Sequence, residues 1–325
     1  MKKFFIVGII SLTASVILGK IILPFLRKLK AGQTVLKYVK THENKNGTPT
    51  MGGLFFIIPS VICYFIFGQT RIASVCATIG LAFMVVGFLD DFIKVKFKRN
   101  EGLKAYQKIL FQGAIAVVAG VFAYINGITF FNLPFTDLTV NLGLFTVPIV
   151  AVVFIAITNC VNLTDGLDGL AGSVSVVYLI AITILISFQT RYLNINVLRE
   201  EEYESLQILA ISLAGGILGF LIFNVSPAKV FMGDTGSLSL GGFIGAISIF
   251  SSNSFFIPLI GITFVLSGIS VIMQVAYYKR TKKRIFLMAP LHHHFQLKGY
   301  SECEISYCYA LITAVMGCVS LLCLS

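Results

Sequence analysis

The stretch IASVCATIGLAFMVVGFLDDFIK, residues 72–94, carries two adjacent aspartates at the end of an apolar run that is long enough to cross a bilayer. A membrane-spanning helix needs about 20 predominantly apolar residues. Carboxylates at the membrane edge are costly to desolvate, and they persist there mainly when they bind an ion, a proton or a cationic partner. The stretch therefore predicts a transmembrane helix with a functional site at its end.

The composition extends this prediction to the whole chain, which is 57% hydrophobic and 12% charged, with a mean hydropathy of +0.90. Soluble domains carry about 25% charged residues. Ten apolar runs follow one another, at about 3–26, 51–67, 72–92, 108–126, 146–160, 171–188, 206–223, 237–250, 255–277 and 305–324. The chain is predicted to be an all-α polytopic membrane protein of about ten transmembrane helices, in a single integral-membrane domain, 1–325. A barrel is excluded because barrel strands alternate in about ten-residue segments.

Residues 1–18 resemble a secretory signal peptide, because Lys2 and Lys3 precede an apolar run. No small-x-small cleavage site follows, and the apolar run continues past Lys20 to Phe25. We expect the segment to be retained as the first span.

Local patterns inside and between the spans predict two further features. Gly215 with Gly219, and Gly241 with Gly245, are spaced for close packing between helices. Segment 127–145 has alternating apolar residues, which predict a short hairpin there.

The charges between the spans predict the orientation. The segments on the first face are 27–50, 93–107, 161–170, 224–236 and 278–304. Most of the Lys and Arg lie there, whereas the opposite face carries only Lys2, Lys3, Arg71, Arg191 and Arg199. The positive-inside rule assigns the first face to the cytoplasm, with both termini outside. The net charge of +11 is spread between spans rather than on one soluble module, so we expect no nucleic-acid partner.

Five of the six aspartates lie on this predicted cytoplasmic face: Asp90, Asp91, Asp165, Asp168 and Asp234. The segments GTPTMGG (47–53) and PLHHHF (290–295) lie on the same face. Polar motifs beside different odd-numbered spans thus converge on one side of the membrane, which predicts a single catalytic or binding site.

The pair Asp90-Asp91 has two interpretations. Adjacent carboxylates repel, so both stay ionised only near a cation, a basic residue or deep water; this favours metal coordination or the positioning of a reacting phosphate. In the other interpretation the pair is a solvated helix end, with Lys94 pairing Asp90 at i,i+4. We favour the interpretation as a functional site, because acids are unfavourable at a helix C-terminus and solvation alone explains the pair poorly.

The other two acidic motifs also allow structural readings. In NLTDGLDGLA (162–171) the i,i+3 spacing puts Asp165 and Asp168 on one face if the turn is helical. NVSPAKVFMGDTGS (224–237) offers hard oxygen ligands that suit a phosphate or magnesium pocket. Either motif could instead be a capped turn before the next helix.

The remaining motifs carry weaker signals. Three consecutive histidines rarely converge on one tetrahedral ion, so we favour one functional histidine over a zinc site. GTPTMGG matches neither the P-loop nor the dinucleotide pattern, although Lys45 beside it could reach an anionic ligand.

This inventory suits phosphoryl transfer, which needs carboxylates for Mg²⁺, lysines for phosphate oxygens and little covalent machinery. The residues alone predict a Mg²⁺-dependent transferase acting on an anionic lipid. An ion-coupled transporter is the rival, because such proteins also place acids beside broken spans.

The ordered set GTPTMGG, GFLDDFIK, NLTDGLDGLAG, PAKVFMGDTGS and PLHHHF closely resembles the phospho-N-acetylmuramoyl-pentapeptide transferase family. The resemblance runs from about residue 24 to 300. The acidic motifs are shared with the wider superfamily of polyprenyl-phosphate N-acetylhexosamine-1-phosphate transferases, and PLHHHF favours the muramoyl branch over the N-acetylglucosamine branch.

The resemblance implies that UDP-N-acetylmuramoyl-pentapeptide (UDP-MurNAc-pentapeptide) and undecaprenyl phosphate give UMP and lipid I in peptidoglycan synthesis. It implies a Mg²⁺ cofactor and a place in the cytoplasmic membrane of a bacterium, with the lipid bilayer as surroundings. A homodimer is left open.

The resemblance also implies residue roles. Asp234 resembles the magnesium ligand, Asp90 and Asp91 the pair at the reacting phosphates, and His292 the functionally sensitive first histidine. The residues that resemble those binding substrate are Lys45, Thr50, Lys94, Lys98, Lys108, Asn162, Asp165, Asp168, Asn224, Phe231 and His293. Phe231 is the candidate to stack on uracil.

The chain departs from the family after its histidines. The family usually has Glu after HHHF where this chain has Gln296, and the next segment lacks the usual Trp. For the reaction we expect one-step displacement with Asp90 assisting the acceptor, and a covalent phospho-aspartate on Asp91 is the competing hypothesis.

Overall fold

The computed structural model describes residues 2–28, 47–97, 102–136, 138–192 and 198–322. Nearly all regular structure in these ranges is helical. The first half contains α1 (Lys2–Lys28), α2 (Gly53–Phe67), α3 (Arg71–Lys96), α4 (Ala105–Ile125) and α5 (Thr146–Thr164). The second half contains α6 (Leu170–Tyr192), α7 (Glu200–Asn224), α8 (Gly233–Phe250), α9 (Ile257–Ile260), α10 (Ile262–Thr281), α11 (Leu291–Leu297) and α12 (Glu302–Leu322).

Eight of the described helices are long and apolar enough to cross a membrane, which confirms an all-α polytopic membrane protein. They are α1, α3, α4, α5, α6, α7, α10 and α12. The apolar helix α2 is shorter, with 15 residues. The predicted span 255–277 divides into α9 and α10 at Gly261, whose non-helical backbone ends α9. Residues 291–297, for which the sequence predicts no helix, form α11.

Helix α8 lies at the centre of the bundle, packed against α3 and α5. Almost every residue of α8 is buried. Because neighbouring helices separate α8 from lipid, its small and polar residues do not have to be transferred into the hydrocarbon of the bilayer. The prediction of close packing through glycine is confirmed: Gly241 faces the backbone of Thr158 in α5.

Helix α1 packs along α7 in the same way. Gly215 faces the backbone of Gly8, and a methyl group at Gly219 would lie 2.6 Å from the carbonyl oxygen of Leu12. The Ser11 hydroxyl adds a buried hydrogen bond to the Ser212 carbonyl, 2.6 Å long. Lipid is as apolar as the surfaces of the helices, so the hydrophobic effect does not drive helix association in a bilayer. Close backbone approach of this kind drives it instead.

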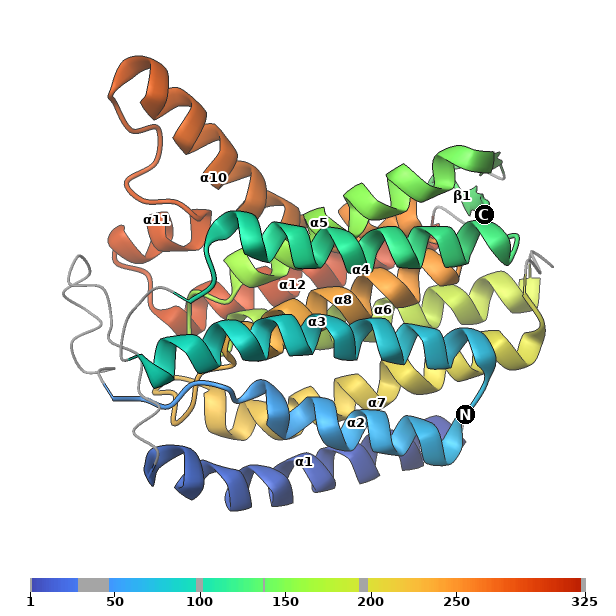
Figure 1. Ribbon diagram of the computed structural model, residues 1–325, viewed down its shortest axis with the longest axis horizontal. Coiled ribbons are helices and arrows are strands. Elements are labelled where there is room, and N and C mark those ends of the chain that lie inside the picture. Colours follow the sequence, from blue (N-terminus) through green and yellow to red (C-terminus); the bar gives the residue numbers. More distant parts are fainter. Residues whose placement is uncertain (1, 29–46, 98–101, 137, 193–197, 323–325) are drawn as a thin grey trace.

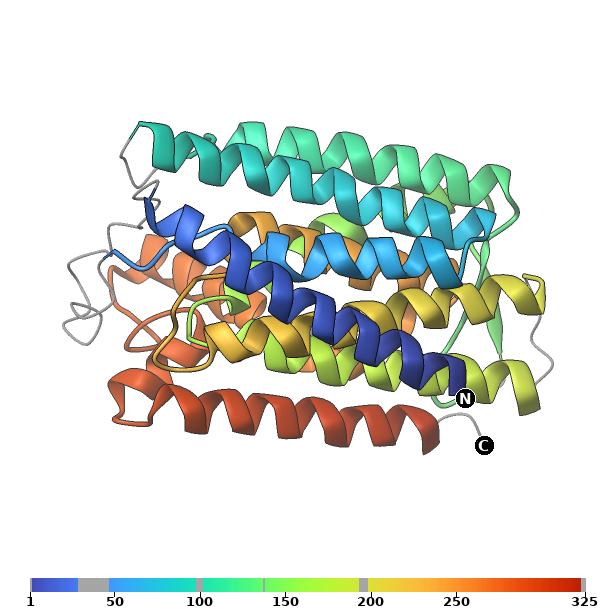
Figure 2. The same cartoon turned by 90° about the horizontal axis from the view of Figure 1, so that it is seen from below.

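Successive helices alternate in direction, so their connections gather at the two ends of the bundle (Figure 1, Figure 2). The start of α1 and the end of α12 lie at one end, and α11 lies at the other. Helix α10 projects obliquely away from the bundle at the α11 end (Figure 1).

The predicted hairpin in 127–145 is confirmed. Strand β1 (Phe130–Asn132) pairs antiparallel with β2 (Thr139–Asn141). It lies at the end of the bundle opposite α11.

Candidate functional site

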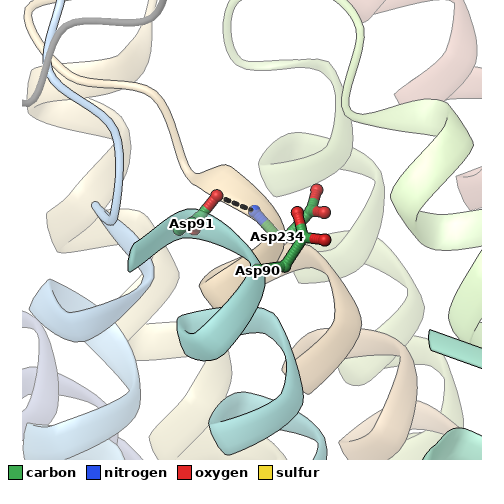
Figure 3. Close-up of side chains that lie close together, drawn as sticks. All are labelled: Asp90, Asp91 and Asp234. Atoms are coloured by element: carbon green, nitrogen blue, oxygen red, sulfur yellow. Dashed lines mark hydrogen bonds between the residues drawn. The ribbon is translucent and has the colours of Figure 1, made fainter. Parts of the chain in front are cut away.

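Asp90 and Asp91 lie inside the last two turns of α3, because the helix continues to Lys96 instead of ending at the aspartates. Gly87, one turn earlier, faces the backbone of Asp234 and Thr235 at the start of α8. The absence of a side chain there lets the two helices touch. This contact brings the first turn of α8 beside the aspartate pair of α3 (Figure 3).

Asp91 is fully buried, and its carboxylate accepts hydrogen bonds from the first turn of α8. The backbone N–H of Asp234 donates to Oδ1 at 3.2 Å, and the N–H of Thr235 donates to Oδ2 at 2.9 Å. The Thr235 hydroxyl also donates to Oδ2, at 2.6 Å. The first N–H groups of a helix have no partner inside the helix, and they carry its positive dipole end. Asp91 therefore anchors α8 from another helix.

Asp90 points away from Asp91, toward the Asp234 carboxyl (Figure 3). Two lysines bridge the two carboxylates. Lys94 lies 2.6 Å from Asp90 and 3.2 Å from Asp234, and Lys108 pairs with Asp234 and lies 4.0 Å from Asp90. The i,i+4 pair of Lys94 with Asp90, expected in the structural interpretation, thus exists as part of a larger charge cluster.

The segment before α4 and helix α5 complete the surroundings of these carboxylates. The backbone N–H of Leu103 donates to Asp90 at 2.8 Å. The amide of Asn162 donates to Asp234 at 2.9 Å and to the Ser237 hydroxyl at 2.8 Å. Each Asp234 oxygen therefore has a fixed direction before any ligand binds.

The cluster could hold a cation. Asp90, Asp91 and Asp234 each offer an oxygen, and these atoms lie within 4.8 Å of one another. Lys94 and Lys108 supply two positive charges against three carboxylates, which leaves one formal negative charge. Hard carboxylate oxygens are the ligands that Mg²⁺ prefers.

The loop between α5 and α6 holds Asp165 and Asp168 on a turn that is not helical, so the i,i+3 argument does not apply. Asp168 is buried and accepts a hydrogen bond from the Ala228 N–H at 2.9 Å. Asn224 is also buried; it accepts from the Gly169 N–H and donates to the Val230 carbonyl. These two side chains tie the α5–α6 loop to the α7–α8 loop.

Asp165 is half-buried and lies near other acids. Burial, followed by the charges of Asp234, Asp91 and Asp168, raises the pKa of Asp165 from 3.8 to about 8. Between these two pH values the folded chain holds a proton that the unfolded chain releases. The contribution of this group to stability therefore falls as the pH rises from about 4 to 8.

Asp165→Asn is expected to weaken the pH dependence of unfolding in the absence of divalent cations. The apparent Tm in detergent should fall less between pH 5 and pH 8 in the variant than in the wild type, and the variant should be the more stable protein at pH 8. Thermal unfolding across this pH range with a chelator measures both. Parallel curves for the two proteins would contradict the pKa assignment.

The glycine-rich segment 47–53 docks on the α7–α8 loop. The Phe231 N–H donates to the Pro49 carbonyl at 2.8 Å, and the Gly52 N–H donates to the Phe231 carbonyl at 2.9 Å. Thr50 is buried, and its hydroxyl has no hydrogen-bond partner among the described residues. The segment thus positions Phe231 and leaves Thr50 facing Gly233.

His292 is fully buried in α11, and neither ring nitrogen has a hydrogen-bond partner in the part of the chain that the structure describes. Its ring lies 4.5 Å from that of His293, measured between centroids. Burial, with a smaller contribution from His293, holds the pKa of His292 well below its usual range. Both Nε2 atoms face Gly166 in the α5–α6 loop. A neutral His292 therefore lies beside the acidic loop with unused hydrogen-bonding capacity.

The structure brings most of the predicted site residues to one end of the bundle. Lys45 and Lys98 lie outside the described residues. Thr235 and Ser237 lie in the motif 224–237 but were not predicted as site residues. In the structure Thr235 is a partner of Asp91, and Ser237 is a partner of Asn162. Gly87 was not predicted to meet another helix, because the residues four positions away, Phe83 and Asp91, are not small and the spacing signal is absent.

Comparisons with known proteins show which family this chain resembles. The model of glycosyl transferase family 4 matches residues 72–252, and signature 1 of phospho-N-acetylmuramoyl-pentapeptide-transferase matches residues 45–57. The phospho-N-acetylmuramoyl-pentapeptide-transferase of Clostridioides difficile (strain 630) is 41% identical over 97% of this chain and 96% of its own. That of Clostridium perfringens (strain 13 / Type A) is 43% identical over 94% of each chain. That of Acetivibrio thermocellus is 42% identical over 95% of this chain and 92% of its own.

The ordered motifs, the helical bundle and relatives that match nearly the full length all lead to one family. This chain belongs to the phospho-N-acetylmuramoyl-pentapeptide-transferase family, within glycosyl transferase family 4.

Proposed function

We propose that this protein transfers phospho-N-acetylmuramoyl-pentapeptide from its UDP-linked precursor to undecaprenyl phosphate, giving lipid I and UMP. The observation that carries the proposal is the pair of carboxylates, Asp90 and Asp234, bridged by Lys94 and Lys108 at one end of a membrane bundle. Phosphoryl transfer needs positioned cations and carboxylates more than covalent machinery. The relatives are named for this transferase.

The proposed location is the cytoplasmic membrane of a bacterium, with the chain acting as one integral-membrane domain. The site would face the cytoplasm, since the segments at its end carry most of the Lys and Arg. A soluble nucleotide could then reach the site from the cytoplasm, while the lipid phosphate reaches it from the bilayer.

The donor set fits Mg²⁺ as the cofactor. Mg²⁺ is usually held by one or two carboxylates and keeps several waters. The Asp91 oxygens already bind the start of α8, so Asp234, with Asp90 beside it, would hold the ion. The ion would supply neutralisation of charge on the pyrophosphate.

The favoured mechanism is one-step displacement. A phosphate monoester has a second pKa of about 6, so undecaprenyl phosphate is largely ionised at neutral pH. Its oxygen would attack the β-phosphorus while the bond from that phosphorus to the UMP oxygen breaks, and UMP leaves with the electron pair. Lys94 and Lys108 would bind phosphate oxygens, and Asp90 would orient the acceptor.

Asp91 is poorly suited to the covalent alternative. Three hydrogen bonds from the start of α8 occupy both of its oxygens. Attack by Asp91 on phosphorus would break these bonds and free the buried N–H groups of α8, each of which would cost roughly 1–3 kcal/mol.

No phosphorylated enzyme is therefore expected when the protein is incubated with the nucleotide substrate and Mg²⁺ but without lipid. Acid quenching of a reaction with β-³²P-labelled nucleotide, followed by gel electrophoresis, measures this. A labelled protein band that Asp91→Asn removes, and that Asp90→Asn retains, would reverse the choice of mechanism.

The function is tested by release of UMP in detergent with Mg²⁺ and undecaprenyl phosphate. The expected result is UMP from UDP-N-acetylmuramoyl-pentapeptide and none from UDP-N-acetylglucosamine. The reverse pattern would move the protein to the N-acetylglucosamine branch. Turnover of neither substrate would favour the ion-coupled transporter. That function is disfavoured because the aspartates of the motifs lie at one end of the helices and not at mid-bilayer.

A further inference from the structure

A row of side chains connects α11 with the α5–α6 loop by way of α12. His293 Nδ1 lies 3.0 Å from Gln296 Oε1, and Gln296 Nε2 lies 3.4 Å from Glu302 Oε1. The other oxygen of Glu302 accepts the backbone N–H of Asp168 at 2.8 Å. One carboxylate at the start of α12 thus connects the histidine segment with the acidic loop.

Helix α12 binds this loop with two successive turns. Glu302 accepts the Asp168 N–H, and Ser306, four residues later on the same face, donates to the Asp168 carbonyl at 3.3 Å. The loop backbone and the Gln296 amide therefore share one rigid support.

The direction of each hydrogen bond follows from which groups can donate. A carboxylate only accepts, so the Gln296 group that faces Glu302 must be its NH₂. The Gln296 oxygen then faces His293, and an oxygen of this kind only accepts. His293 Nδ1 must therefore carry a proton.

We propose that Glu302 and Gln296 are positioning residues that hold His293 as the Nδ1–H tautomer. In a neutral ring this makes Nε2 a hydrogen-bond acceptor. Nε2 faces the α5–α6 loop: a methyl group at Gly166 would come within 3.0 Å of it. The ring thus offers an acceptor to an N–H or O–H of the uridine nucleotide, a role that rests on the proposed function.

The substitution Glu302→Gln tests the direction of the relay while keeping its contacts. The Asp168 N–H would take the oxygen of the new amide, whose NH₂ would then donate to the Gln296 oxygen. Gln296 would turn its own NH₂ toward His293, which forces the Nε2–H tautomer. The variant should convert an acceptor that faces the nucleotide into a donor.

The double variant Gln296→Glu/Glu302→Gln is the matched control. The carboxylate at position 296 would accept from His293 Nδ1–H, and the amide at position 302 would donate to it while accepting the Asp168 N–H. Every contact, the net charge and the original tautomer are restored. A purely structural clamp would not distinguish the single from the double variant in this way.

The experiment is ¹⁵N NMR of the histidine-labelled full chain in detergent, with His293 assigned by difference from His293→Gln. The expected result is Nδ1–H in the wild type, Nε2–H in Glu302→Gln, and Nδ1–H again in the double variant. In UMP release, the single variant should raise the KM for the nucleotide about tenfold, the effect of one hydrogen bond, with little change in kcat. The double variant should recover most of that loss.

An Nε2–H or doubly protonated ring in the wild type at pH 7.5 would overturn the proposal, and this arm needs no variant to fold. Retention of Nδ1–H in a folded Glu302→Gln would also overturn it. If the wild type releases no UMP, the proposed function fails on its own, whereas the NMR spectra still decide the direction of the relay.

Discussion

Asp234→Asn is expected to lower kcat for UMP release about a thousandfold and to remove its dependence on Mg²⁺. The carboxylate pairs with Lys94 and Lys108, and it is the proposed magnesium ligand. A bound metal contributes several kcal/mol to transition-state stabilisation, and each 1.36 kcal/mol corresponds to a factor of ten. The contact of α8 with Gly87 uses the backbone of Asp234, so the amide should leave the fold intact.

The measurement is a Mg²⁺ titration of UMP release, together with thermal unfolding in detergent. Glu204→Gln is the matched control, because it also turns an acid into an amide. Glu204 forms a half-exposed pair with Lys3 near the start of α7, about 30 Å from the site by helix rise, and such pairs contribute little. Near-normal, Mg²⁺-dependent activity in Asp234→Asn would contradict the assigned role.

Gly87→Ala is expected to destabilise the protein by about 2 kcal/mol and to lower kcat on the order of a hundredfold. The added methyl group would overlap the Asp234 carbonyl and lie 2.7 Å from the Thr235 nitrogen. These are backbone atoms at the start of α8, so the conflict cannot be relieved by a side-chain rotation. Separating the helices would move Asp234 away from Asp90 and stretch the hydrogen bonds that Asp91 accepts.

Gly113→Ala in α4 is the control, because a methyl group there meets nothing within 4 Å. In a helix interior this change is neutral or stabilising by up to about 1 kcal/mol. Thermal unfolding and UMP release at saturating substrate compare the two variants. If Gly87→Ala behaved like Gly113→Ala in both assays, the close contact of α3 with α8 would not be what builds the site.

The sequence predicted the helices well, since the apolar runs match the described helices within several residues. It also predicted that the motifs converge on one end. The break at Gly261 and helix α11 were missed: a single non-helical residue interrupts an otherwise apolar run, and the polar segment 291–297 lacks the signal of a span.

The two adjacent aspartates show where the sequence reached its limit. Nothing in the sequence motif distinguishes Asp90 from Asp91. In the structure, Asp90 joins the charge cluster with the lysines, and Asp91 anchors α8. The difference arises from contacts with Asp234 and Thr235, which lie more than 140 residues further along the chain. Likewise, the sequence predicts that Asp168 and Asn224 bind substrate, and it gave no sign of the hydrogen bonds by which they join two loops.

The sequence by itself determined that this protein is a bundle of membrane helices with five of its six aspartates at one end. That information is local, because a span must satisfy its backbone hydrogen bonds within its own helix and be apolar over about 20 residues. Only the tertiary structure decided which carboxylates pair with the lysines, which one caps a helix and which histidines face the acidic loop. Those roles depend on how side chains from separate helices approach within hydrogen-bonding distance, and glycine contacts such as that of Gly87 with α8 set that approach.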